Sequence, residues 1–177
     1  MAECRFPYAG VWPQVAADAF IAPSAVLVGD VSIAARSSVW FQCVLRADSN
    51  IIRVGEDTNI QDGTIVHVDT GNFPTIIGNK VTVGHAAIVH ACTLHDGAFV
   101  GMGATVLDGA VIEAGGMLAA GSLLAPGKRI GAGELWRGSP ARLVRVLDAG
   151  ERARFAATAA HYVELAKQFR EEMNNRA

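Results

Sequence analysis

Val100 to Leu135 read VGMGAT-VLDGAV-IEAGGM-LAAGSL-LAPGKR-IGAGEL, six consecutive units that each begin with an aliphatic residue and carry Gly or Ala at the fourth or fifth place. Much the same spacing extends backwards through Val89 to Val83. A period of six fits neither a helix nor an alternating strand, but it fits short strands joined by tight corners. We therefore expect an all-β solenoid in which each unit forms one side of a coil and points its aliphatic residue inward.

The composition and the charge of the chain suit one domain of this kind. A length of 177 residues allows a substantial core, and 19 glycines with only 7% aromatic residues suit many corners around a narrow bore. The net charge of -2 argues against a nucleic-acid partner, which usually requires a basic face. We expect no secretory signal and no membrane span, because no apolar run is long enough. The odd number of cysteines, three, favours reduced thiols and a cytoplasmic location.

The start of the repeat divides the first part of the chain into two segments. Residues 1–19 are expected to be a lead-in segment, because Pro7 and Pro13 oppose regular structure. Residues 20–142 are expected to form the solenoid. The repeat slips across residues 69–74, which predicts a short loop that bulges from one corner.

The C-terminal segment has a different pattern. The solenoid is expected to end near Pro140, which disrupts strand pairing, and residues 143–177 are expected to be a linker and an amphipathic helix. Asp148 and Glu151 are spaced like a capping box at the start of that helix. Apolar residues at helical spacing follow, so we expect the helix to pack on the β-helix or on a neighbouring subunit.

Three histidines occupy informative places in the repeat. His67 directly follows Val66 and His90 directly follows Val89, so these two histidines share a phase and should lie on neighbouring coils on one face. His85 has the other phase and should point away from the pair within one chain. A third imidazole must then come from an adjacent copy, and a cyclic trimer is the natural closed arrangement. Three imidazoles with one open position are typical of a catalytic zinc site.

Polar motifs accompany the histidines: Arg46-Ala47-Asp48, Asn59-Ile60-Gln61-Asp62, Val83-Gly84-His85 and Gly138-Ser139-Pro140-Ala141. On these motifs, and over roughly residues 10–175, the chain resembles the gamma-class carbonic anhydrase family of hexapeptide-repeat proteins. The resemblance implies a left-handed parallel β-helix. It also implies a homotrimer whose activity is the reversible hydration of carbon dioxide to bicarbonate by a metal-bound hydroxide.

The resemblance also implies the roles of individual residues. His67 and His90 of one subunit and His85 of the next would bind the metal, which is zinc in this family, with iron or cobalt also invoked. Gln61, with Asn59 near it, would orient the metal-bound hydroxide. The remaining pair, Arg46 and Asp48, would form ion pairs across the subunit interface.

Two positions depart from the pattern of active family members. Ser49 stands where those members carry a glutamate directly after the Arg-x-Asp motif, and Asp69 is the only acidic residue in the short loop after His67. Both departures remove groups that would move protons to solvent. These departures from the family pattern therefore imply hydratase activity that is weak or absent.

Two other functions fit the same fold. A CoA-dependent acyltransferase or thioesterase would need one histidine as a general base and a CoA groove between subunits. A metal-binding structural trimer would keep the site only to hold its subunits together. His95 and His161 are expected to be surface residues in each case.

Overall fold

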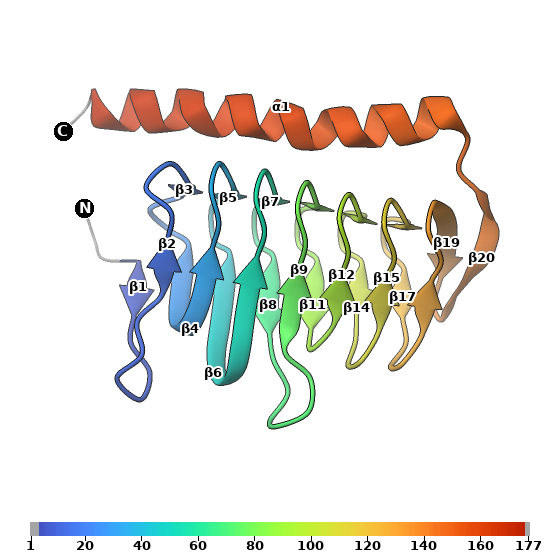
Figure 1. The fold of residues 1–177 in the computed structure, drawn as a ribbon, viewed down its shortest axis with the longest axis horizontal. Helices are drawn as coiled ribbons and strands as arrows, with labels where there is room; N and C mark the ends of the chain where they lie inside the picture. Colours follow the sequence, from blue (N-terminus) through green and yellow to red (C-terminus); the bar gives the residue numbers. More distant parts are fainter. Residues whose placement is uncertain (1–3, 176–177) are drawn as a thin grey trace.

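The computed structural model describes residues 4–175, which form a stack of short strands followed by one long helix (Figure 1). The strands wind as a left-handed β-helix of about seven turns, so the fold predicted from the repeat and the family resemblance is confirmed. The strands are β1 (Arg5–Phe6), β2 (Gln14–Val15), β3 (Phe20–Ile21), β4 (Val26–Ile33), β5 (Ser38–Val39), β6 (Val44–Val54), β7 (Asn59–Ile60), β8 (Ile65–His67), β9 (Thr75–Ile77), β10 (Thr82–Val83), β11 (Ile88–His90), β12 (Thr93–Leu94), β13 (Phe99–Val100), β14 (Thr105–Val106), β15 (Val111–Ile112), β16 (Met117–Leu118), β17 (Leu123–Leu124), β18 (Arg129–Ile130), β19 (Glu134–Gly138) and β20 (Ala141–Val146).

Successive coils place their strands on three faces. One face is an eight-stranded sheet in the order β20-β19-β16-β13-β10-β7-β5-β3. The other two faces belong to one twelve-stranded sheet, because β6 pairs with β8 through its first residues and with β9 through its last. We call the face formed by β8, β11, β14 and β17 the histidine face. Strands on every face pair in parallel, apart from the antiparallel pair β19–β20 that closes the stack.

In the two-residue and three-residue strands from β10 to β18, one buried aliphatic side chain from each strand fills the bore. Val66 of β8 and Val89 of β11 are fully buried and pair in register. Burial of such a side chain stabilises the fold by about 1.5–3 kcal/mol, which fixes the phase of each strand. The residues on either side of a core residue therefore point outward, and this places His67 and His90 on the outside of the solenoid.

The helix α1 (Ala149–Asn174) begins at the capping box predicted from the sequence. The Asp148 carboxylate accepts from the Glu151 backbone N–H at 2.8 Å, and the Glu151 carboxylate accepts from the Asp148 N–H at 3.0 Å. The helix runs back along the solenoid toward the first coils (Figure 1). Between residues 4 and 175, no helix combines the length and the apolar character needed to cross a membrane.

Aromatic side chains attach α1 to the eight-stranded sheet. Phe169 of the helix packs edge-on against Trp40, with ring centroids 5.1 Å apart. Near the start of the helix, Phe155 packs against Phe99 of β13 at 5.0 Å. Edge-to-face pairs of this kind add to the stabilisation from burial alone. The helix therefore covers this sheet and leaves the histidine face open.

Two segments contain more strand than the sequence pattern predicts. In the expected lead-in segment, β1 and β2 pair in parallel with β4, and Pro7 and Pro13 lie just outside the paired residues. At the other end, β20 occupies residues expected in part to be linker. Pro140 sits in the turn between β19 and β20 and not within either strand, so it does not prevent their pairing.

Candidate metal centre

His67 and His90 lie side by side at the edge of the histidine face. They are register partners at the ends of β8 and β11, 23 residues apart in sequence. Their ring centroids are 5.1 Å apart, and Nδ1 of His67 lies 3.1 Å from Nε2 of His90. This separation is close to the roughly 3.3 Å expected between two nitrogens that share one tetrahedral zinc. The expectation that these two histidines lie on neighbouring coils and project from one face is met by the geometry.

The outer nitrogen of each imidazole faces a carboxylate. Nε2 of His67 lies 3.0 Å from Asp48 Oδ1, and Nδ1 of His90 contacts the Asp108 carboxylate. An ionised carboxylate only accepts hydrogen bonds, so in the neutral form of both rings each outer nitrogen carries the hydrogen and each inner nitrogen carries a lone pair. The two lone pairs converge. Two lone pairs at 3.1 Å repel each other, so the arrangement is favourable when a cation lies between them.

The neighbours of Asp48 stabilise its ionised form. Burial by itself raises the pKa of Asp48, but the hydrogen bond from His67 and the adjacent Arg46 guanidinium together outweigh it. The pKa of Asp48 therefore lies below its usual value. Arg46 pairs with Asp48 within the same chain. The ion pair between subunits expected for these two residues stays a prediction.

His85 lies at a different corner of the coil. It follows β10 and precedes β11, with its Nδ1 2.9 Å from Asp62 Oδ2 and 43% of its side chain exposed. In the part of the chain that the structure describes, no three His, Cys, Asp or Glu side chains are grouped so that they could hold a metal. A single chain therefore brings two of the three predicted ligands together and holds the third apart.

Asn59 lies in β7 and Gln61 directly follows that strand. The strand β7 pairs with β10, which is followed by His85. Gln61 Nε2 donates to Asn59 Oδ1 at 3.0 Å, and Asn59 in turn donates to Thr82 Oγ1 at 3.0 Å. Both side chains are buried. The next coil stacks directly on this corner, since Ala86 N donates to Asp62 O at 2.8 Å. The amide of Gln61 is thus oriented by a hydrogen-bond chain that runs along the coils.

The charged and histidine side chains of the site, with Gln61, therefore divide into two groups on opposite edges of the histidine face. We call Arg46, Asp48, His67, His90 and Asp108 the histidine-pair corner. We call Gln61, Asp62 and His85 the His85 corner. Since β8 and β11 separate the two corners, one copy of the chain offers two half-sites.

Known proteins are similar to this chain in sequence. No family model matches the chain. A protein of Methanocaldococcus jannaschii named "Probable carbonic anhydrase" is 52% identical over 83% of this chain and 92% of its own length. The chain belongs to the gamma-class carbonic anhydrase family. "Gamma carbonic anhydrase 2, mitochondrial" of Arabidopsis thaliana is 51% identical over 88% of this chain. The chain spans only 58% to 62% of the length of three such Arabidopsis relatives.

Solved structures place this family member among the hexapeptide-repeat proteins. The crystal structure of a hexapeptide transferase family protein from Anaplasma phagocytophilum superposes with a TM-score of 0.91 at 49% identity and covers 96% of this chain and 99% of its own. That agreement extends over nearly the whole chain. It supports the assignment of the fold and does not identify the reaction.

Two carboxylates of this gamma-class family member were not assigned a role from the sequence. Asp108 lies 18 residues after His90, one full coil of three units, so the period itself was the available signal. Asp62 was visible only as part of the polar motif around Gln61. The sequence gives no indication of which imidazole nitrogen either carboxylate would contact.

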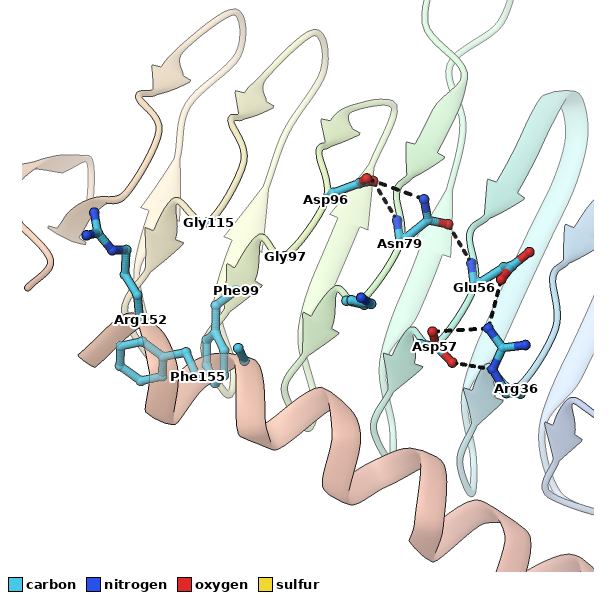
Figure 2. Close-up of a pocket in the computed structure, with 12 residues that line it drawn as sticks. Arg36, Glu56, Asp57, Asn79, Asp96, Gly97, Phe99, Gly115, Arg152 and Phe155 are labelled. Carbon is cyan, nitrogen blue, oxygen red and sulfur yellow. Dashed lines mark hydrogen bonds and ion pairs between the residues drawn. The ribbon is translucent and has the colours of Figure 1, made fainter. Parts of the chain in front are cut away.

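A groove of this family member with a volume of about 840 Å³ lies elsewhere, between α1 and the solenoid. Figure 2 shows that some of its polar side chains contact one another, whereas Arg152 at the other end makes no such contact. Asp96 accepts from Asn79, Asn79 accepts from the Glu56 backbone N–H, and Arg36 pairs with Glu56 and Asp57. None of the histidines is among the described residues that line it. The groove is therefore separate from both half-sites.

Proposed function

We propose that the chain is a zinc-dependent, gamma-type carbonic anhydrase that reversibly hydrates carbon dioxide at sites shared between the subunits of a homotrimer. Relatives named as carbonic anhydrases support the reaction class. One observation carries the proposal: two imidazole nitrogens face each other at 3.1 Å, and each ring has a carboxylate on its opposite nitrogen. This donor set fits a divalent transition metal, because neutral imidazoles held by carboxylates are typical zinc ligands.

The two half-sites complement each other. The histidine-pair corner offers two ligands and the His85 corner offers a third, so a second copy could complete the set. His85 carries its own carboxylate, Asp62, which leaves Nε2 as the ligating atom. Ile65 and Ile88 lie between the corners and are 40% and 44% exposed. An apolar surface flanked by two incomplete polar sites favours contact with another copy of the chain.

In this proposal His67 and His90, with His85 of a second copy, would hold a metal that would supply a nucleophile at neutral pH by lowering the pKa of water toward about 7. The protein residues would hold the metal and orient the water. Gln61 donates through Nε2 to Asn59, which leaves its Oε1 to accept a hydrogen bond from a water in the site. Ser49 is exposed beside Asp48 and carries no proton-transfer group. We therefore expect slow turnover that increases with added buffer.

The first test measures metal content and stopped-flow hydration on purified protein, with iron and cobalt loading as alternatives to zinc. His67→Ala, His85→Ala and His90→Ala should each lose most of the bound metal and the activity. His95→Ala is the matched control, because its imidazole lies outside both corners, and it should retain both. Retention of metal by all three single variants would contradict the proposal.

A mixing experiment tests whether the site is shared. Chains with His67→Ala and chains with His85→Ala are each inactive in the proposal, but mixed trimers contain interfaces with an intact ligand set. Co-refolding the two variants should therefore restore activity. The control mixture of His67→Ala with His90→Ala should restore none, because both of those ligands come from the same subunit. Equal recovery in both mixtures would exclude the shared site.

An acyl-transfer function has support from solved structures, since one neighbour at 36% identity is described as a putative acetyltransferase of Bacillus cereus. That function needs one essential histidine and no metal. Acetyl-CoA turnover that depends on a single histidine would replace the hydratase proposal. A metal-dependent rise in the melting temperature without hydratase activity would instead favour the structural role. A cytoplasmic location stays a prediction from the cysteine usage.

A further inference from the structure

Asp108 has one conspicuous contact. Its carboxylate faces Nδ1 of His90 from the following coil. Asp48 divides its charge between His67 and Arg46, and Asp62 accepts from the Phe41 backbone N–H as well as contacting His85. Within residues 4–175, the hydrogen bonds of the Asp108 side chain go to His90 alone. Its carboxylate is thus committed entirely to one imidazole.

The corner that carries Asp108 does not require a carboxylate to form. Val106 pairs with Leu124 on the next coil, so Asp108 and Pro126 occupy equivalent places two residues later. Gly109 and Gly127 follow them, with φ of +63° and +66°. The same turn is therefore made with proline at the equivalent place. The side chain of Asp108 is available for a purpose other than turn formation.

We propose that Asp108 is a positioning residue that fixes His90 as its Nδ1–H tautomer and so directs the Nε2 lone pair toward Nδ1 of His67. This role rests on the proposed function, because the converging lone pairs are the metal-binding half-site. Without the carboxylate, the His90 ring can rotate or carry its hydrogen on Nε2, and either change removes a ligand. Loss of an outer carboxylate typically weakens metal affinity by about 10-fold to 100-fold.

The tautomer can be tested on metal-free protein. Long-range ¹H–¹⁵N NMR of the histidine rings should show His90 with its hydrogen on Nδ1 in the unchanged protein and a shift toward the Nε2–H form in Asp108→Ala. Asp96→Ala is the matched control, because Asp96 is also a corner carboxylate but bonds to Asn79. The control should leave the His90 signals unchanged. Identical His90 signals in Asp108→Ala and the unchanged protein would overturn the proposal.

Zinc affinity provides the second measurement. Competition with a chromophoric chelator should show about 10-fold to 100-fold weaker zinc binding in Asp108→Ala and no change in Asp96→Ala. Asp108→Asn preserves the size of the side chain and removes its charge, so it should also weaken binding if the alanine variant folds poorly. Thermal unfolding of the metal-free variants separates this effect from a loss of fold. Unchanged affinity in both Asp108 variants would refute the positioning role.

The outcomes distinguish this inference from the proposed function. If the unchanged protein binds zinc but hydrates no carbon dioxide, the hydratase proposal fails, while the affinity loss in Asp108→Ala still supports the positioning role. If the protein is active and Asp108→Ala binds zinc as tightly as before, the positioning role fails alone. If the unchanged protein binds none of zinc, iron and cobalt, the proposed function fails, and the His90 signals of metal-free Asp108→Ala decide the positioning role by themselves.

Discussion

At the scale of single residues, burial decides the chemistry of the three cysteines. Burial raises the pKa of Cys43 to about 11, against smaller opposing effects of backbone hydrogen bonds. Burial also raises the pKa of Cys92, with a further contribution from the charge of Asp108. Both thiols are therefore protonated and inaccessible at neutral pH. Cys4 is partly exposed near the first coil.

The thiols should therefore differ in reactivity. A chromogenic disulfide reagent at neutral pH should modify Cys4 in the native protein and reach Cys43 and Cys92 only after unfolding, because thiolates react and buried thiols stay protonated. The measurement counts released chromophore before and after addition of guanidinium chloride. Cys4→Ser is the control and should abolish the native-state reaction. Rapid native reaction in that variant would show that the interior is accessible.

At the scale of elements, the corners set two different demands on glycine. Gly103 has φ of +64° and open space around its Cα, so its requirement is conformational. Gly101 has ordinary backbone angles, but a Cβ there would lie 2.3 Å from the backbone nitrogen of Ala120 on the next coil. Glycine is therefore required at position 101 because a larger residue would not fit. Residues two apart in sequence are therefore constrained by separate physical causes.

These two glycines should respond differently to substitution. Gly103→Asn should cost about 1 kcal/mol, because asparagine tolerates the left-handed conformation. Gly101→Ala should cost about 3 kcal/mol or more, because the coil above must move away. Urea unfolding of both variants compares their free energies of unfolding. A milder effect for Gly101→Ala than for Gly103→Asn would contradict the close approach of these coils.

The start of α1 should give a measurable pH dependence. The side-chain hydrogen bond with Arg145, with a further backbone hydrogen bond from Asp148, lowers the pKa of Glu151 from its usual 4.5 to about 2. A lowered pKa in the folded state stabilises the protein above pH 4.5, and this contribution is lost as the pH falls toward 2. Melting temperatures from pH 6 to pH 2 should therefore fall less steeply for Glu151→Gln. Equal slopes would show that the cap is not coupled to folding, and added salt should reduce the difference since these groups are exposed.

At the scale of the whole molecule, the solenoid presents three faces with different exposure. The eight-stranded sheet is covered by α1, whereas the histidine face exposes Ile65 and Ile88 between the two half-sites. A chain that leaves this face in water keeps both half-sites incomplete. The proposed trimer would cover the face and complete the sites at once.

The assembly should therefore be sensitive to charge on this face. Ile88→Glu should dissociate the trimer and lower zinc content in parallel, because a carboxylate cannot be buried there without a partner. Val144→Glu on β20 is the matched control, since both side chains are 44% exposed and Val144 lies away from the histidine face. Analytical ultracentrifugation and metal analysis are the measurements. Dissociation by Val144→Glu and not by Ile88→Glu would identify a different interface.

Much of the architecture was predictable because the repeat has one consistent physical cause. A six-residue period places one aliphatic residue of every unit in the bore, and the phase of Val66 and Val89 then places His67 and His90 on neighbouring coils. The capping box at Asp148 was predictable for a similar reason, because its hydrogen bonds are local. The pairing of β1 and β2 with β4 was missed, because such short strands carry little periodic signal.

The sequence by itself determined the coil, the phase of its histidines and the position of the helix start, because each depends on residues close together along the chain or on a strict period. Only the tertiary structure decided which atoms meet. The facing nitrogens of His67 and His90 and the carboxylates of Asp48 and Asp108 come from different coils, separated by 18 to 23 residues. Their approach depends on strand register across an irregular loop and on the side-chain conformation at each corner, and neither is encoded in a local pattern.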